Sequence, residues 1–280
     1  MNKTKIIISS NSGFCFGVKR ALNIAEAALK KKKKVYSLGP IIHNPQVVRD
    51  FSGKGLKIVK DARKIASRKA AILVPSHGMS PGVLKNKKVT CIDTTCPLVS
   101  RVQKIVKALR RKGYLVVIVG DRKHPEVRAL AGIAPRNHVV LKDKKHARDL
   151  DLKCKKIAVV SQTTASLSSF KEILSEIAKK DVTELVGFNT VCKNTIDRQR
   201  EAEHIAGSVE AMFVIGGKQS ANTSRLADTC RRVNKHTYHI ESGKDLKKKF
   251  FKGRKSIGIV TGASTPPYAL KEVIKKIKED

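Results

Sequence analysis

Short apolar runs rich in β-branched residues alternate with stretches of helical periodicity along the whole chain. The runs are continuous rather than alternating in polarity, as is typical of parallel strands buried on both faces. They predict strands at 5–9, 35–37, 71–75, 89–92, 114–119, 139–141, 157–161, 182–186, 212–215 and 256–261. Helices are predicted between them, most clearly at 18–31, 98–112, 166–179 and 269–278. This alternation predicts an α/β fold with mostly parallel sheets.

Three segments share one layout, in which a polar loop leads to a cysteine that opens a helix. The cysteines are Cys15, Cys96 and Cys192, and each helix carries an arginine near its first turn (Arg20, Arg101 and Arg198). The cysteines are 81 and 96 residues apart, about the length of one small α/β unit. The repetition predicts three related α/β modules, at 1–95, 96–190 and 191–280, arranged in pseudo-threefold fashion around a common axis.

Each cysteine is followed by two polar loops that come after predicted strands. The first loop lies 28 residues beyond the cysteine and carries His43, His124 or Ser220. The second lies 62, 67 or 72 residues beyond it and carries His77, Thr163 or Ser264. Ligands of parallel sheets bind beyond the carboxyl ends of the strands, so we expect the side chains on these loops to bind the ligand.

Three cysteines at helix N-termini favour a soft metal, because the helix dipole and free N–H groups stabilise a thiolate. Three thiolates leave a four-iron cube one ligand short, so that one iron can bind substrate. Three cysteines and a histidine would instead suit structural zinc, but zinc ligands usually come in closely spaced pairs. We expect the other cysteines, Cys91, Cys154 and Cys230, to be buried small apolar residues.

The polar loops suit an anion. Histidines follow three of the apolar strands. The segments GGKQSANTSR and TGASTPP offer hydroxyls and helix-start N–H groups that can cradle phosphate oxygens. The chain contains neither a Walker P-loop nor a G-x-G-x-x-G motif, which removes support for ATP and dinucleotides. Glu126, two residues after His124, is either a proton donor in a closed apolar site or an ordinary helix-start glutamate.

The chain carries 59 Lys and Arg against 23 Asp and Glu, a formal charge of +36. Such an excess raises the alternative of a nucleic-acid-binding protein. The lysines are spread along the whole chain, however, and aromatic residues make up only 4% of it. We therefore expect no specific nucleic-acid binding. No apolar run approaches the roughly 18 to 20 residues of a membrane helix, and the N-terminal run is too short for a signal peptide, so we expect no membrane association and a cytoplasmic location.

Nine motifs follow one another along residues 6–270: GFCFGVKRA, HNPQVV, SHGMSP, DTTCPLVSRV, HPEVRALAG, SQTT, CKNTIDRQ, SANTSRLA and TGASTPP. In this order they closely resemble the 4-hydroxy-3-methylbut-2-enyl diphosphate reductase family, which completes the non-mevalonate isoprenoid pathway. The resemblance implies three α/β modules around a [4Fe–4S] cluster. It also implies reductive removal of the allylic hydroxyl as water, giving isopentenyl and dimethylallyl diphosphate.

The resemblance implies roles for individual residues. Cys15, Cys96 and Cys192 would hold the cluster, Thr163 would contact the reacting hydroxyl, and Glu126 would supply protons through a relay. The diphosphate would be held by His43, His77, His124, Ser220, Asn222 and Ser264. The family usually has Ser-Ser-Asn where this chain has Ser220-Ala221-Asn222, so one side-chain hydroxyl is missing from the pocket.

Electrons for such a reaction arrive singly, so the resemblance implies a ferredoxin or flavodoxin as electron donor. Those carriers are usually acidic, and a chain of charge +36 would attract them strongly at low salt. Two alternatives stay open at this point: a basic nucleic-acid-binding protein and a zinc-dependent hydrolase that uses the same cysteines and histidines.

Overall fold

The computed structural model describes residues 4–31, 34–65, 70–83, 89–153 and 155–279. Its strands are β1 (Lys5–Ile8), β2 (Val35–Leu38), β3 (Leu56–Val59), β4 (Ala71–Val74), β5 (Thr90–Asp93), β6 (Leu115–Val119), β7 (His138–Leu141), β8 (Lys156–Ser161), β9 (Glu184–Phe188), β10 (Ala211–Ile215), β11 (Thr237–Ile240) and β12 (Ser256–Thr261). Its α-helices are α1 (Phe16–Lys31), α2 (Pro45–Gly53), α3 (Pro97–Arg111), α4 (Pro125–Ile133), α5 (Lys144–Arg148), α6 (Leu167–Ala178), α7 (Lys193–Ser208), α8 (Ala221–Val233) and α9 (Pro267–Glu279). Short 3₁₀ turns are η1 (Ala62–Lys64), η2 (Gly243–Asp245) and η3 (Lys248–Phe250).

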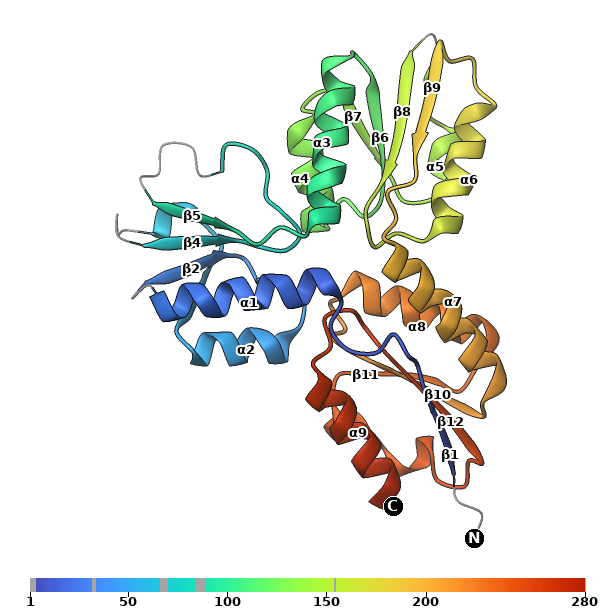
Figure 1. Cartoon of the computed structure of the whole chain (residues 1–280). Coiled ribbons are helices and arrows are strands. Elements are labelled where there is room, and N and C mark those ends of the chain that lie inside the picture. Colours follow the sequence, from blue (N-terminus) through green and yellow to red (C-terminus); the bar gives the residue numbers. More distant parts are fainter. Residues whose placement is uncertain (1–3, 32–33, 66–69, 84–88, 154, 280) are drawn as a thin grey trace. The chain divides into compact units, whose positions relative to one another are not determined.

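These strands form three four-stranded sheets in which every pairing is parallel (Figure 1). Sheet A has the order β1-β12-β10-β11, sheet B the order β5-β4-β2-β3, and sheet C the order β9-β8-β6-β7. The three orders are equivalent: an outer strand that precedes a cysteine, two central strands that precede the polar loops, and a second outer strand. The predicted class, three parallel α/β modules, is confirmed.

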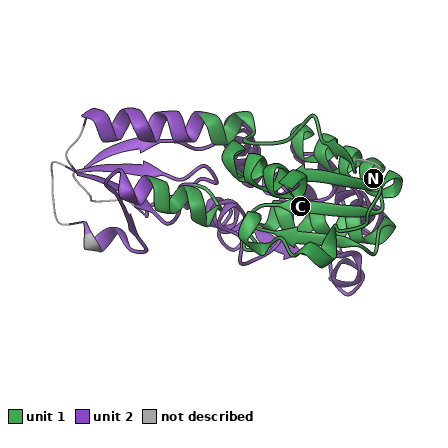
Figure 2. Ribbon diagram, turned by 90° about the horizontal axis from the view of Figure 1, so that it is seen from below, with its two compact units in different colours: residues 1–19, 42–50, 193–280 green, residues 20–41, 51–192 purple. Residues whose placement is uncertain are grey.

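The chain divides into two compact units (Figure 2). Unit 1 comprises residues 1–19, 42–50 and 193–280 and contains sheet A. Unit 2 comprises residues 20–41 and 51–192 and contains sheets B and C. The predicted boundaries at 95/96 and 190/191 remain a prediction, but β1, expected in the first module, pairs in register with β12 of sheet A. A parallel strand can join a sheet from any distance along the chain, so local pattern does not assign it.

Sheet A is covered on both faces by helices with aliphatic stripes. On one face, α9 places Ala269, Val273 and Ile277 against β10 and β12. On the other face, α7 and α8 contribute Ala202, Ile205, Leu226 and Cys230. The i, i+4, i+8 spacing of the α9 residues puts them on one side of that helix, so its lysines remain on the solvent side.

Sheet C is built on the same plan within unit 2. Val102, Val106 and Leu109 of α3 pack with residues of α4 over the valine-rich β6 and β8. On sheet B, Ile72 of β4 is fully buried in a smaller cluster that includes Tyr36. The core is aliphatic, as the low aromatic content requires.

Two strands, β3 and β11, were not predicted. Each is an outer strand of four residues, and β11 (sequence TYHI) contains only one strongly apolar aliphatic residue. The expectation that Cys91 is buried is wrong. It lies exposed in β5, an outer strand in which three of the four residues are exposed. Cys230 is buried as expected, and Cys154 lies outside the described residues.

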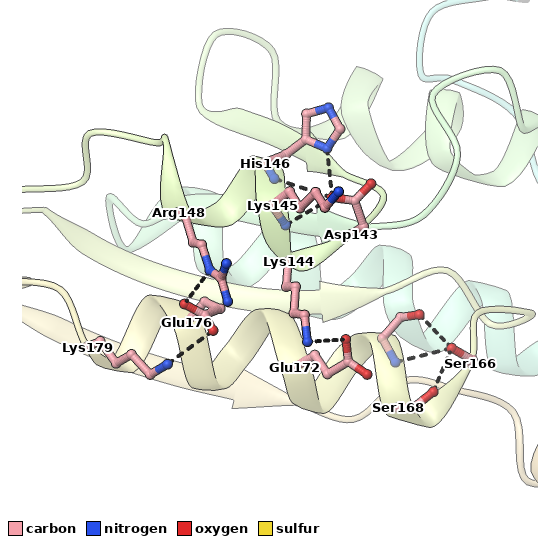
Figure 3. Close-up of polar contacts among 11 residues, drawn as sticks. Asp143, Lys144, Lys145, His146, Arg148, Ser166, Ser168, Glu172, Glu176 and Lys179 are labelled. Atoms are coloured by element: carbon pink, nitrogen blue, oxygen red, sulfur yellow. Dashed lines mark hydrogen bonds and ion pairs between the residues drawn. The ribbon is translucent and has the colours of Figure 1, made fainter.

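Some of the basic side chains form ion pairs on the solvent side of the helices. Figure 3 shows α5 and α6 joined by Lys144–Glu172 (3.8 Å) and Arg148–Glu176 (3.4 Å), with Lys179 also on Glu176 (3.1 Å). Hydrogen bonds from Lys179 and Arg148 lower the pKa of Glu176. Exposed pairs of this kind contribute little to stability. In the described part of the chain, no helix is both long enough and apolar enough to cross a membrane.

Candidate active site

The three repeat cysteines have the same backbone environment. Each follows an outer strand, and its N–H donates to a carbonyl two residues beyond the end of the neighbouring strand. The bonds are Cys15 N–H to Ala263 (3.0 Å), Cys96 N–H to Ser76 (2.9 Å) and Cys192 N–H to Thr163 (2.8 Å). In each sheet, one of the two polar loops, the one after β12, β4 or β8, is thereby fixed to a cysteine.

Each cysteine also lies directly before a helix. The carbonyl of Cys15 accepts from Lys19 (2.9 Å) and that of Cys96 from Ser100 (2.9 Å), the first bonds of α1 and α3. Cys96 is the N-cap of α3, its side chain makes no capping hydrogen bond, and Pro97 follows at the first helical position. A thiolate at such a position is favoured by the first-turn N–H groups and by the dipole.

The loop that leads to Cys15 is held by an acidic residue, Glu201 of α7. Its carboxylate accepts from the hydroxyl of Ser9 (2.7 Å), the N–H of Ser10 (2.6 Å) and the side-chain amide of Asn11 (2.8 Å). Burial alone would raise the pKa of Glu201, but these hydrogen bonds outweigh burial and lower it to about 2. The sequence gives no sign of this role for Glu201, because nothing near it marks a partner 190 residues away.

Arg198, one turn before Glu201 on α7, holds the next part of the same loop and is only 4% exposed. Its guanidinium donates to the carbonyls of Gly13 (2.8 Å) and Thr261 (2.9 Å). The N–H of Gly13 in turn donates to the Thr261 hydroxyl (2.7 Å). Segment 9–13 is therefore tied to α7 and to the end of β12 before the chain reaches Cys15.

The loop around Cys96 in unit 2 is built similarly. Arg20 of α1 donates to the carbonyl of Thr95 (3.0 Å), the residue before Cys96. His77 directly follows Ser76, whose carbonyl binds Cys96, and its Nδ1 lies 3.0 Å from the carbonyl oxygen of Gly78. Gly78 has φ +77° and its hypothetical Cβ would lie 2.3 Å from the Gln103 amide nitrogen, so only glycine fits this turn.

His124, Glu126 and Thr163 lie together at the carboxyl edge of sheet C. His124 is the N-cap of α4 and accepts the N–H of Glu126 at Nδ1 (3.2 Å). The carboxylate of Glu126, 2% exposed, accepts both the N–H (2.7 Å) and the hydroxyl (2.8 Å) of Thr163. A buried carboxylate bonded to a hydroxyl at a strand end is an arrangement in which a proton can pass between two side chains.

Within unit 1, Ser220 and Asn222 follow β10 and Ser264 follows β12, while His43, just before α2, contacts Ser264. Ser264, 7% exposed, donates to the carbonyl of His43 (3.2 Å). Ser220 caps α8 by accepting the N–H of Thr223 (3.4 Å). Burial lowers the pKa of His43, so its imidazole is neutral near pH 7.

Two features of this cluster fit an anionic ligand. The amide nitrogen of Asn222, in the first turn of α8, is buried and has no hydrogen-bond partner among the described residues. A Cβ on Gly217 would lie 3.2 Å from the carbonyl oxygen of His43, and one on Gly262 would lie 2.1 Å from the Thr223 hydroxyl. The glycines thus allow the loops to approach closely around an unpaired donor and a helix N-terminus, which are the elements of a phosphate cradle.

The donor set of the three cysteines fits a thiolate-ligated cluster, because all three are in the described part of the chain, none forms a disulfide, and each lies before a helix. No group of three or more His, Cys, Asp or Glu side chains within the described residues is arranged as a metal site. Cys15 belongs to unit 1, and Cys96 and Cys192 belong to unit 2. The meeting of the three sulfurs therefore stays a prediction.

The sequence pattern of the LytB protein family matches residues 6–278. The 4-hydroxy-3-methylbut-2-enyl diphosphate reductase of Caldanaerobacter subterraneus subsp. tengcongensis is 43% identical over 280 residues, covering 98% of this chain and 96% of that protein. The protein of the same name from Geobacter sulfurreducens is 40% identical over 279 residues, covering 98% of this chain and 97% of that protein.

Solved structures give the same picture. One, of (E)-4-hydroxy-3-methyl-but-2-enyl diphosphate reductase, the terminal enzyme of the non-mevalonate pathway, is 38% identical with a TM-score of 0.71, and the match covers 99% of this chain and all of that one. Another, of the E-1-hydroxy-2-methyl-but-2-enyl-4-diphosphate reductase from Plasmodium falciparum, is 26% identical with a TM-score of 0.91, covering 98% of this chain and 87% of that one.

Proposed function

Because this chain belongs to the LytB protein family, we propose that it reduces 4-hydroxy-3-methylbut-2-enyl diphosphate to isopentenyl and dimethylallyl diphosphate. The observation that carries the proposal is identity of about 40% over nearly the full length of reductases with this activity in their names. The balance is simple: two electrons and two protons enter, the allylic C–O bond breaks, a C–H bond forms, and the hydroxyl leaves as water.

We propose that Cys15, Cys96 and Cys192 hold a [4Fe–4S] cluster with one iron free of protein ligands. The shared backbone environment of the three cysteines supports this, because the backbone N–H of each cysteine donates to a carbonyl in a strand-end loop. When bound, the cluster supplies single electrons and a Lewis-acidic iron that weakens the C–O bond. The protein's own contribution is to orient the substrate and to deliver protons.

The diphosphate is proposed to lie on the polar loops. Two kinds of donor remain although Ala221 has no hydroxyl. They are the side-chain amide of Asn222, which has no partner among the described residues, and the N–H groups at the N-terminus of α8, which begins at Ala221. The other proposed binding residues are His43, His77, His124, Ser220 and Ser264. Neutral His43 would bind the anion as a hydrogen-bond donor rather than as a cation.

Thr163 and Glu126 are proposed to deliver a proton to the leaving hydroxyl. The Thr163 hydroxyl donates to the Glu126 carboxylate at 2.8 Å. Once Glu126 is protonated, it would donate across the same contact to the Thr163 oxygen, and the Thr163 hydroxyl proton would pass to the leaving hydroxyl. The second hydrogen bond to the same carboxylate, from the Thr163 N–H, fixes its orientation. Burial keeps bulk water from competing for that proton.

A small one-electron carrier such as ferredoxin or flavodoxin is the proposed electron donor. The charge of +36 supports an acidic carrier, whose association would weaken as salt is added. We also propose a cytoplasmic location, where reducing conditions keep cysteine ligands as thiols. The comparisons give no support to the alternatives, a nucleic-acid-binding protein or a zinc-dependent hydrolase.

The test is turnover under anaerobic conditions. Protein reconstituted with iron and sulfide, supplied with a reduced one-electron donor and the hydroxylated diphosphate, should form the two isoprenoid diphosphates. The Cys96→Ser variant should form neither, and Cys91→Ser, a change of an exposed cysteine outside the repeat pattern, should match the unaltered protein. Air-stable hydrolysis supported by zinc, with no reductive product, would contradict the proposal.

A further inference from the structure

The three repeat arginines do not have the same surroundings. Arg198 of α7 is 4% exposed, Arg20 of α1 is half-buried, and Arg101 of α3 is exposed. Five or six residues separate each one from the cysteine that opens its helix. Their similar place in the repeat would suggest a similar role, but their partners differ.

The partners of the two less exposed arginines follow one rule. Arg20, on the helix opened by Cys15, donates to the carbonyl of Thr95, the residue before Cys96 (3.0 Å). Arg198, on the helix opened by Cys192, donates to the carbonyl of Gly13, two residues before Cys15 (2.8 Å). Each of these arginines therefore holds the loop of a cysteine from a different repeat, not the loop of its own.

We infer that Arg198 and Arg20 are positioning residues for the cysteine ligands: Arg198 sets the loop of Cys15 and Arg20 sets the loop of Cys96. The inference rests on the proposed function only in treating these cysteines as cluster ligands. The position of one cysteine ligand would therefore depend on an arginine from the helix that follows a different cysteine.

The chemistry of arginine fits this task. The guanidinium of Arg198 uses three nitrogens at once, toward Gly13, toward Thr261 (2.9 Å) and toward the side chain of Asn194 (2.9 Å). Carbonyl oxygens at chain turns are otherwise difficult to satisfy in a buried site, and a planar fork of five N–H donors can join two of them rigidly. Lysine carries all its donors on one nitrogen at the end of a flexible stem, so it cannot reproduce this planar fork.

The experiment measures thiol reactivity in the cluster-free protein, so that it does not depend on activity. Under reducing conditions, alkylation of Cys15 and of Cys96 is followed by mass spectrometry of their peptides. Arg198→Lys should raise the rate at Cys15 about tenfold and leave Cys96 unchanged, because loss of charge-assisted hydrogen bonds frees one loop. Arg20→Met, which removes the donor to the Thr95 carbonyl, should do the reverse, and Arg101→Met, at the equivalent exposed position, should change neither.

Three results would overturn the inference. One is a parallel rise at both cysteines in Arg198→Lys, which would mean general destabilisation. The second is no change at the assigned cysteine, and the third is a rise at the other cysteine instead. If Arg198→Lys does not fold, Arg20→Met still decides, because Arg20 is only half-buried.

Iron content separates this inference from the proposed function. Reconstituted protein that binds no iron would contradict the proposed function, whatever the alkylation rates are. Protein that binds iron normally, but whose alkylation rates do not shift in the two variants, would contradict only the positioning role.

Discussion

The Glu126–Thr163 pair gives the most informative mutation in the site. Glu126→Gln keeps the shape of the side chain and one carbonyl oxygen, which can still accept the Thr163 N–H, now at 2.7 Å. The NH2 group of the glutamine takes the place of the oxygen that accepts from the Thr163 hydroxyl. The hydroxyl can rotate and accept a hydrogen bond from that NH2 group instead. Every buried polar group thus keeps a partner, but the position can no longer carry an acidic proton.

The expected effects on stability and on turnover therefore differ widely. Glu126→Gln should cost less than ~1 kcal/mol of unfolding free energy, because no buried group is left unpaired. Glu126→Ala should cost ~2–3 kcal/mol, because it removes the acceptor of the buried Thr163 N–H. Loss of a positioned proton donor should reduce the turnover of Glu126→Gln by about 10²- to 10⁴-fold, with iron content and substrate affinity retained.

Denaturant unfolding, substrate binding at equilibrium and anaerobic turnover would be measured on both variants. A Glu126→Gln protein that retains its iron and turns over within tenfold of the unaltered rate would remove Glu126 from proton transfer. Equal destabilisation by Gln and Ala would show that the hydrogen bonds to Thr163 are assigned wrongly.

Two further predictions come from unit 1. The pKa of about 2 for Glu201, against 4.5 in an unfolded chain, means that its contribution is complete above pH 4.5 and is lost as the pH falls toward 2. Glu201→Gln should thus lower the unfolding free energy by ~2 kcal/mol at pH 7, after allowance for partial exposure. Urea titrations at falling pH should show the difference in unfolding free energy between the variant and the unaltered protein shrink. A difference that stays constant with pH would refute the role of ionisation. Asn222→Ala removes a buried donor that has no partner among the described residues, so the substrate KM should rise about 10- to 100-fold with iron content unchanged. Asp228→Asn, an exposed position later on the same helix, should leave KM unaltered, and an unchanged KM in Asn222→Ala would place the diphosphate elsewhere.

Much of the fold could be predicted from local pattern. The central strands β6 and β10 are continuous apolar runs of five residues, and β8 and β12 have an apolar centre between polar end residues, as burial on both faces requires. The outer strands β3 and β11 escaped prediction because their short, partly polar sequences are stabilised by pairing with a neighbour. The place of β1 in sheet A depends on a pairing with residues about 250 positions away, for which the sequence has no local signal.

The site divides in the same way. The repeat offsets pointed to His43, His124, Ser220 and Thr163 as residues of strand-end loops, because strand ends in parallel sheets meet at one edge, and their roles stay predictions. The contact between Thr163 and Glu126 was not predicted from the residues. Glu201 and the partners of Arg198 and Arg20 could not be predicted. Their contacts join segments that are remote in sequence, and a charged residue on a helix is usually a solvated one.

The claim on which the account depends is that three cysteines together bind one iron–sulfur cube with a corner left open. Iron, sulfide and zinc determination on anaerobically reconstituted protein tests it most directly, with the Cys15→Ser, Cys96→Ser and Cys192→Ser variants measured alongside. We expect about four irons and four sulfides per chain in the unaltered protein and substantial loss in each variant. Zinc in place of iron, or full iron content in any one of the three variants, would contradict the claim.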